Sequence, residues 1–109
     1  MLIPCEPDRY SEGFVTKVPM IYSSVANEGA SLTAYNYSNP LQGPNQTAAN
    51  QVTFGLSLCT GANATILRNQ YGLTTYRYQY AGNWSNQDPL PWMGAYHSSD
   101  LAVSLLTPA

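Results

Sequence analysis

Two stretches of the chain have the short hydrophobic patterns typical of β-strands. Residues 18–25 are apolar or small and carry no charge, which predicts a strand buried on both faces. Residues 73–80 alternate, with tyrosines on one face and Thr75, Arg77 and Gln79 on the other. The pattern therefore predicts two strands that are far apart in the sequence.

A helix is predicted from Thr47 onward, because apolar residues recur there on one stripe. The residues of this stripe, which is expected to face a core, are Ala48, Val52, Leu56 and Cys59. Gly55 and Gly61 interrupt the pattern, so a second, short helix is predicted over residues 62–71, closed by Gly72.

Proline and glycine residues divide the rest of the chain into less regular segments. Residues 1–12 are predicted to form an irregular, solvated entry, and residues 29–35 to begin a helix that ends quickly. Residues 36–46 are predicted to form a loop and residues 82–96 a long ordered loop. Residues 100–106 are predicted to form a short helix or a frayed end.

The composition allows one domain and excludes two classes of partner. The chain has 109 residues, of which 44% are hydrophobic and only 9% are charged, and its net charge is −2. Without a basic face, nucleic acid is not expected as a partner. The apolar runs are too short to cross a membrane. No metal-ligand cluster or phosphate-binding loop is present, so no metal and no cofactor are expected.

Cysteines and glycosylation motifs bear on the compartment of the protein. Cys5 and Cys59 permit one disulfide in an oxidising compartment, but they can equally be two unpaired thiols. Asn-x-Ser/Thr motifs, which are possible glycan acceptors, begin at Asn36, Asn45, Asn63 and Asn83. The chain as written is not expected to carry an export signal, because its start lacks a basic and then an apolar region.

One acidic residue and the single histidine lie where two loops can bring them together. Glu28 follows the first predicted strand in an Asn27-Glu28-Gly29 turn, and His97 follows the long loop after the second strand. A carboxylate bonded to one ring nitrogen fixes the tautomer of a histidine and leaves the other nitrogen as a general base. On residue types alone, a structural or solvent-exposed His97 is equally plausible, because six carboxylates always offer the histidine some pair.

Three segments around this pair match a known sequence pattern. Residues 18–29 contain an apolar strand that leads into the Asn-Glu-Gly turn, residues 54–68 are helical, and residues 76–101 contain Gly94-Ala95-Tyr96-His97. Together these segments resemble the C-terminal part of the type-B carboxylesterase/lipase family, the α/β-hydrolases that include cholinesterases and many secreted fungal esterases. The match is weakest over residues 36–50.

The resemblance implies a fold and a site. It implies an α/β fold class, namely a C-terminal fragment of an α/β-hydrolase fold with two or three strands, short helices and long loops. Residues 1–109 would then be a single partial domain whose strands lie within a larger parallel sheet. In the family pattern Glu28 is the acid and His97 the general base of a Ser-Glu-His triad, and Asp100 is a flanking residue. A carboxylic ester would be the substrate of a complete enzyme, and the protein would be secreted and glycosylated.

The nucleophile of such a triad is missing from the sequence. In α/β-hydrolases the serine lies in a Gly-x-Ser-x-Gly turn that precedes the acid. The nearest pattern, Gly55-Leu56-Ser57-Leu58-Cys59, lacks the last glycine and follows the acid. The chain is therefore expected to be inactive alone, and to be only marginally stable unless it refolds, forms a homo-oligomer or docks on a complementary N-terminal hydrolase segment.

A non-catalytic binding or interaction module is the second hypothesis. It rests on the low charge and on the aromatic content, with a possible sugar-stacking or protein-contact surface formed by Tyr76, Tyr78, Tyr80, Trp84 and Trp92. For Trp84, Trp92 and Tyr96, packing of the long loop onto its own domain is favoured over lining a pocket.

Overall fold

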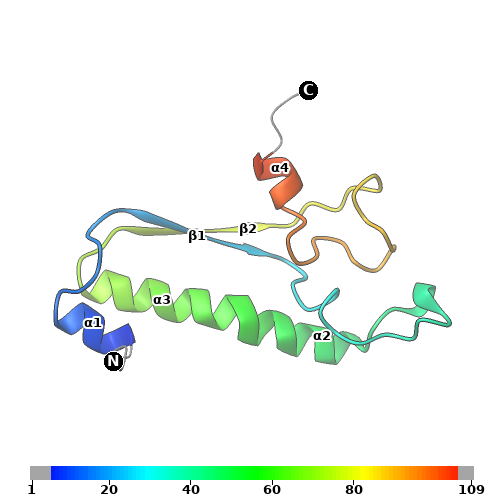
Figure 1. The fold of residues 1–109 in the computed structure, drawn as a ribbon, viewed down its shortest axis with the longest axis horizontal. Helices are drawn as coiled ribbons and strands as arrows, with labels where there is room; N and C mark the ends of the chain where they lie inside the picture. Colours follow the sequence, from blue (N-terminus) through cyan, green and yellow to red (C-terminus); the bar gives the residue numbers. More distant parts are fainter. Residues whose placement is uncertain (1–5, 106–109) are drawn as a thin grey trace.

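In the computed structural model, which describes residues 6–105, a two-stranded parallel sheet lies along one long helical segment (Figure 1). Strand β1 (Met20–Val25) pairs with β2 (Thr75–Tyr80) in a register that runs from Met20 opposite Thr75 to Val25 opposite Tyr80. Both predicted strands are confirmed. Because parallel strands run in the same direction, the chain leaves both of them at the same edge of the sheet.

The crossover between the strands contains one continuous helical segment rather than two short helices. Helix α2 (Gln46–Thr53), the π-helical turn η2 (Phe54–Leu58) and α3 (Cys59–Gln70) follow one another without a gap (Figure 1). The predicted interruption is therefore wrong, whereas the predicted end at Gly72 is confirmed. Gly72 has a φ of +70°, and the Leu73 N–H donates to the Arg68 carbonyl, as in a typical helix C-terminus.

The glycines that suggested a break have other roles. A Cβ at Gly61 would overlap the ring of Tyr22 on β1, so glycine here allows the helix to approach the sheet closely. The Tyr22 hydroxyl also lies 3.3 Å from Thr60 Oγ1. A Cβ at Gly55 would meet nothing within 4 Å, and the chain accommodates Gly55 inside the π-helical turn.

The buried face of the long helix is not the predicted apolar stripe. Its buried residues are small, apart from one arginine near the C-terminal end, and they are Ala49, Thr53, Ser57, Gly61 and Arg68. Small residues are needed here because β1 and the Asn27-Glu28-Gly29 turn (hereafter the acid turn) lie directly against the helix. Leu56, from the predicted stripe, and Phe54 are instead 49% and 56% exposed.

The expectation that the first strand is buried on both faces is also wrong. The helix covers the face of β1 that carries Tyr22, whereas Ile21 on the opposite face is 69% exposed. Tyr76, the register partner of Ile21 on β2, is 62% exposed. A parallel sheet normally has both faces covered. Within the described residues only one face of this sheet is packed.

The shorter elements complete the fold. Helix α1 (Glu6–Ser11) corrects the prediction of an irregular entry from residue 6 onward, because the first turn of a helix tolerates a proline such as Pro7. The first five residues of that predicted entry lie outside the described residues. Residues 29–35 form turns and a bend instead of the predicted helix start. The loops over 36–46 and 82–96 are present, the first with a short 3₁₀ turn, η1 (Pro40–Gln42). The short C-terminal helix is confirmed as α4 (Leu101–Leu105).

The described residues bear on two predictions for the chain as a whole, namely that no segment crosses a membrane and that Cys5 and Cys59 could form a disulfide. Among residues 6–105 no helix combines the length and the apolar character needed to cross a membrane. Cys59 is exposed at the start of α3. Cys5, with which it could form a disulfide, lies outside the described residues.

Candidate active site

The loops that carry Glu28 and His97 meet at the carboxyl edge of the sheet. β1 ends at Val25 and leads directly into the turn that holds Glu28. The Ala26 N–H donates to the Tyr80 carbonyl at 2.8 Å, which extends the strand pairing by one residue. In open parallel α/β sheets, this edge is where binding and catalytic groups gather.

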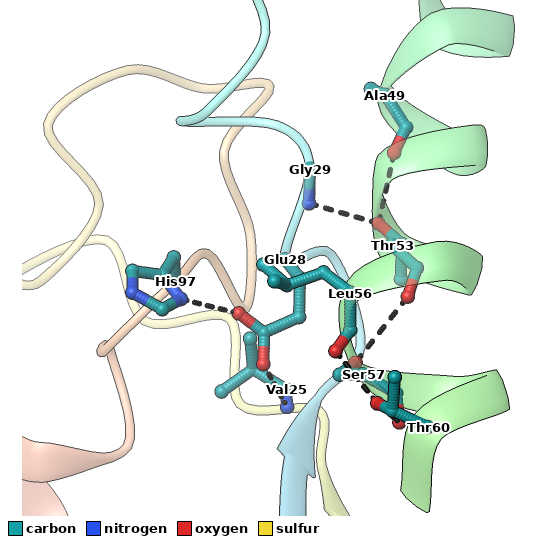
Figure 2. A network of polar contacts seen from close by, with 9 residues as sticks. All are labelled: Val25, Glu28, Gly29, Ala49, Thr53, Leu56, Ser57, Thr60 and His97. Atoms are coloured by element: carbon teal, nitrogen blue, oxygen red, sulfur yellow. Dashed lines mark hydrogen bonds and ion pairs between the residues drawn. The ribbon is translucent and has the colours of Figure 1, made fainter. Parts of the chain in front are cut away.

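Glu28 and His97 form a short hydrogen bond. Glu28 Oε2 lies 2.6 Å from His97 Nδ1, and the other carboxylate oxygen accepts the backbone N–H of Val25 at 3.2 Å (Figure 2). The Glu28 side chain is 10% exposed and the His97 side chain is 48% exposed. The carboxylate is thus held from two sides in a mostly buried position, and the imidazole reaches toward solvent.

This arrangement fixes the tautomer of the histidine. An ionised carboxylate can only accept hydrogen bonds, so Nδ1 must carry the proton that lies between the two groups. In the neutral ring, Nε2 is then an acceptor. Figure 2 shows this second nitrogen on the side of the ring away from Glu28. The pair therefore presents an accessible base that a buried carboxylate orients.

The long helix holds the acid turn from the opposite side. The Gly29 N–H donates to Thr53 Oγ1 at 2.9 Å, and the same hydroxyl donates to the Ala49 carbonyl at 3.0 Å (Figure 2). A Cβ at Gly29 would overlap that carbonyl, so only glycine fits between the turn and the helix. The glycine of the Asn-Glu-Gly turn is therefore required by the close approach of two backbones.

Residues 81–100, the loop that carries His97 (hereafter the histidine loop), are held by contacts that the sequence did not reveal. The Asn27 side chain donates to the Met93 and Trp92 carbonyls, and the Asn27 N–H donates to the Ala95 carbonyl. Ser98, directly after His97, has a φ of +69°, a conformation that is uncommon for residues other than glycine. Left-handed residues other than glycine cluster at functional sites, but no sequence signal marks them in advance.

Asp100 does not join the pair. It is half-buried at the start of α4, where its carbonyl accepts the N–H groups of Val103 and Ser104. Among the described residues its side chain makes no hydrogen bond to Glu28 or His97.

The aromatic side chains of the loop pack against the chain itself. Trp92 Nε1 donates to the Pro40 carbonyl at 2.7 Å. The Trp92 and Tyr35 rings pack edge-on, with their centroids 5.1 Å apart. Trp84 Nε1 donates to the Tyr80 hydroxyl at 3.1 Å, and the Tyr96 hydroxyl donates to the Gln87 carbonyl at 3.2 Å. For Trp92 and Tyr96 these contacts agree with the prediction that the aromatic residues pack the loop. Trp84 differs, because it is 56% exposed and lines a surface pocket formed by residues 83–91.

Within the described part of the chain, no hydroxyl or thiol group is hydrogen-bonded to His97. Ser57, which lies in the nearest pattern to a nucleophile motif, is buried in η2, and its hydroxyl donates to the Thr53 carbonyl at 3.4 Å. Its hydroxyl is therefore turned back onto its own helix. The described residues supply an oriented base but no group for it to activate.

Comparisons with known proteins identify relatives among fungal esterases and lipases. The chain is 39% identical over 97 residues to Secreted lipase 5 of Gibberella zeae, an alignment that covers 85% of this chain and 18% of the lipase. It is 52% identical over 52 residues to chlorogenic acid esterase of Aspergillus niger, covering 48% of this chain and 10% of the esterase. The chain thus spans less than a fifth of the length of these relatives. No protein-family model and no solved structure matches it.

Proposed function

We propose that this chain is the C-terminal part of a type-B carboxylesterase/lipase-like α/β-hydrolase and supplies the acid and the base of its Ser-Glu-His triad. The hydrogen bond of 2.6 Å between Glu28 and His97 carries the proposal. Its position at the carboxyl edge of a parallel sheet supports it, because catalytic groups of α/β folds gather there. The similarity to two fungal enzymes named as a lipase and an esterase supports it independently.

In the proposed reaction His97 moves the protons. Nε2 accepts the proton of a serine hydroxyl as the serine attacks the ester carbonyl, and it then donates this proton to the departing alcohol. Glu28 keeps the ring in the correct tautomer and stabilises the imidazolium that forms. The serine and the oxyanion-stabilising N–H groups would come from sequence outside this chain.

The shape of the chain supports its assignment as a partial domain. Its radius of gyration is 17.2 Å, compared with about 13 Å for a compact domain of this length. None of the described large side chains is fully buried. Ile21 and Tyr76 on the uncovered sheet face, and Leu56 on the helix, provide apolar surface that a complementary hydrolase segment would cover. A second copy of the chain is the other candidate partner, and sedimentation of the purified chain distinguishes the two.

A hybrid enzyme tests the proposed catalytic roles. In Secreted lipase 5, the segment aligned with this chain is replaced by residues 1–109 of this chain, and hydrolysis of a p-nitrophenyl ester is measured. We expect the hybrid to be active, and His97→Ala and Glu28→Gln each to lower its kcat by roughly 10³-fold or more. Glu12→Gln, an exposed carboxylate outside the site, is the matched control and should leave the rate unchanged. An active hybrid that keeps its rate after His97→Ala would contradict the proposal.

The isolated chain provides the complementary test. We expect no ester hydrolysis above that of its own His97→Ala variant, because the nucleophile is supplied elsewhere. A large rate that depends on His97 in the isolated chain would show that the nucleophile lies within these residues after all.

Secretion is part of the same proposal. One relative is named a secreted lipase, and the four possible glycan acceptors are all exposed: Asn36, Asn45, Asn63 and Asn83. Expression through a eukaryotic secretory route should therefore give a product whose mass falls on treatment with a peptide N-glycosidase. A product of unchanged mass would remove the glycan part of the proposal.

An aromatic binding module is the second candidate function. Tyr76 and Tyr78 are exposed on the uncovered face of the sheet, which favours it. Both tryptophans, however, use their ring N–H groups for contacts within the chain. Titration with oligosaccharides, followed by tyrosine and tryptophan fluorescence, should show a saturable change if this face stacks on sugars, and none if it is covered by a hydrolase segment.

A further inference from the structure

The side chain of Asn27 connects the turn that carries Glu28 with the loop that carries His97. Its amide nitrogen donates to the Met93 carbonyl at 2.8 Å and lies 3.3 Å from the Trp92 carbonyl. The backbone adds a third contact, because the Asn27 N–H donates to the Ala95 carbonyl at 2.9 Å. This residue is thus bonded to three positions in the five residues that precede His97.

These contacts matter because the histidine loop has no regular structure of its own. Between the end of β2 and the start of α4, residues 81–100 contain neither helix nor strand. The other described side-chain hydrogen bonds of this loop have three kinds of partner. One lies within the loop, two are to Tyr80 at the end of β2, and one is to the Pro40 carbonyl on a different loop. Apart from the Glu28–His97 bond itself, the contacts of Asn27 are the described hydrogen bonds that join this loop to the acid turn.

The chemistry of the contact selects an amide. Two successive backbone carbonyls point toward the same position, and both can only accept hydrogen bonds. A primary amide has two N–H donors on one nitrogen and serves both acceptors, whereas a hydroxyl has one donor and an aliphatic side chain has none. Asn27 is half-buried, so its loss would leave these carbonyls without partners in a site where water has limited access.

We infer that Asn27 is a positioning residue for His97: its amide sets the distance between the imidazole and Glu28 by holding residues 92–93 against the acid turn. This inference rests on the proposed function, but it concerns the geometry of the pair and not the chemistry itself. A base that is displaced by about 1 Å loses much of its efficiency, so the effect appears in kcat rather than in substrate binding.

Asn27→Ala tests the inference, with Asn45→Ala as the matched control. The Asn45 side chain also bonds to the backbone, since its Oδ1 accepts the Ala48 N–H at 3.0 Å, but it does so at the start of α2, away from the histidine loop. In the hybrid enzyme, we expect Asn27→Ala to lower kcat by about 10- to 100-fold with KM changed less than about threefold. Asn45→Ala should change both constants by less than about threefold.

Proton NMR of the imidazole provides a readout that a general loss of stability does not reproduce. An Nδ1–H proton bonded to a carboxylate resonates at low field, separate from the amide signals. We expect this signal in the parent and in Asn45→Ala, and its broadening or loss in Asn27→Ala while the amide spectrum of β1 and β2 is retained. The signal is recorded in the isolated chain and in the hybrid, and whichever of them is folded decides the question.

The two proposals fail in different ways. If Glu28→Gln and His97→Ala leave an active hybrid unchanged, the proposed function is wrong. If those variants inactivate the hybrid but Asn27→Ala matches Asn45→Ala in kcat and in the imidazole signal, only the positioning role is wrong. Loss of the amide spectrum in Asn27→Ala at conditions where Asn45→Ala stays folded would also overturn it, because Asn27 would then support the fold as a whole.

Discussion

Thr53→Val should loosen the acid turn without creating a cavity. Thr53 is buried at 5% exposure, and its hydroxyl accepts the Gly29 N–H at 2.9 Å while donating to the Ala49 carbonyl at 3.0 Å. Valine has nearly the same shape and a similar helix propensity, so the substitution removes mainly the hydroxyl. The Gly29 N–H is then buried without a partner, which costs about 1–3 kcal/mol of the free energy of unfolding.

Thr65→Val is the control for this prediction. Thr65 lies in the same helical segment, and its hydroxyl donates to the carbonyl four residues earlier, that of Gly61, at 2.7 Å. In the described residues that hydroxyl accepts no backbone N–H from another segment, so the same substitution should change the stability by only about 0.5 kcal/mol. Urea denaturation of the hybrid enzyme, followed by far-UV circular dichroism, measures both variants. Equal midpoints for Thr53→Val and Thr65→Val would refute the claim that the helix holds the acid turn through this hydroxyl.

Three further predictions use the same denaturation assay. Gly29→Ala should destabilise the chain by about 2–3 kcal/mol, because its Cβ would overlap a backbone carbonyl. Gly55→Ala, with open space around it, should stabilise the chain by about 0.5–1 kcal/mol. Equal effects of the two substitutions would contradict the close approach of the acid turn to the helix. Arg68→Met should cost about 1–3 kcal/mol, because the buried guanidinium donates to the Val18 carbonyl and to a hydroxyl on β2, both at 2.7 Å; a neutral result would show that these bonds are not needed. Ser98→Val should cost at least about 1 kcal/mol, since a β-branched residue fits a φ of +69° poorly, and an unchanged midpoint would argue against that conformation.

The elements that sequence patterns predicted best are those whose signals are local. Alternation over 73–80 and the uncharged apolar run over 18–25 each indicate a strand without reference to the rest of the chain. The Asn-Glu-Gly turn and the Gly-Ala-x-His loop identified the two residues that the structure brings together, Glu28 and His97. Their meeting could be anticipated because both loops follow strands that were expected to be parallel.

The predictions that failed depend on contacts with distant segments. Glycine in a helical stretch is compatible with a break and with close packing, and only the position of Tyr22 shows that Gly61 serves packing. The helix buries its small residues because β1 and the acid turn approach it closely, so the apolar stripe is not its packed face. The partners of Asn27 are main-chain carbonyls about 65 residues away, and a carbonyl has no signature in the sequence.

Three consecutive residues of the acid turn are attached to two other parts of the molecule, the histidine loop and the long helix. Asn27 contacts the histidine loop, Glu28 the imidazole, and Gly29 the long helix. The geometry of the pair is thus determined by hydrogen bonds within this chain, even though none of its described large side chains is fully buried. Hydrogen bonds are directional and fix positions, whereas apolar burial mainly supplies stability. The chain can therefore fix the relative positions of Glu28 and His97 by its own hydrogen bonds, and under the proposed function a complementary hydrolase segment would supply most of its stability.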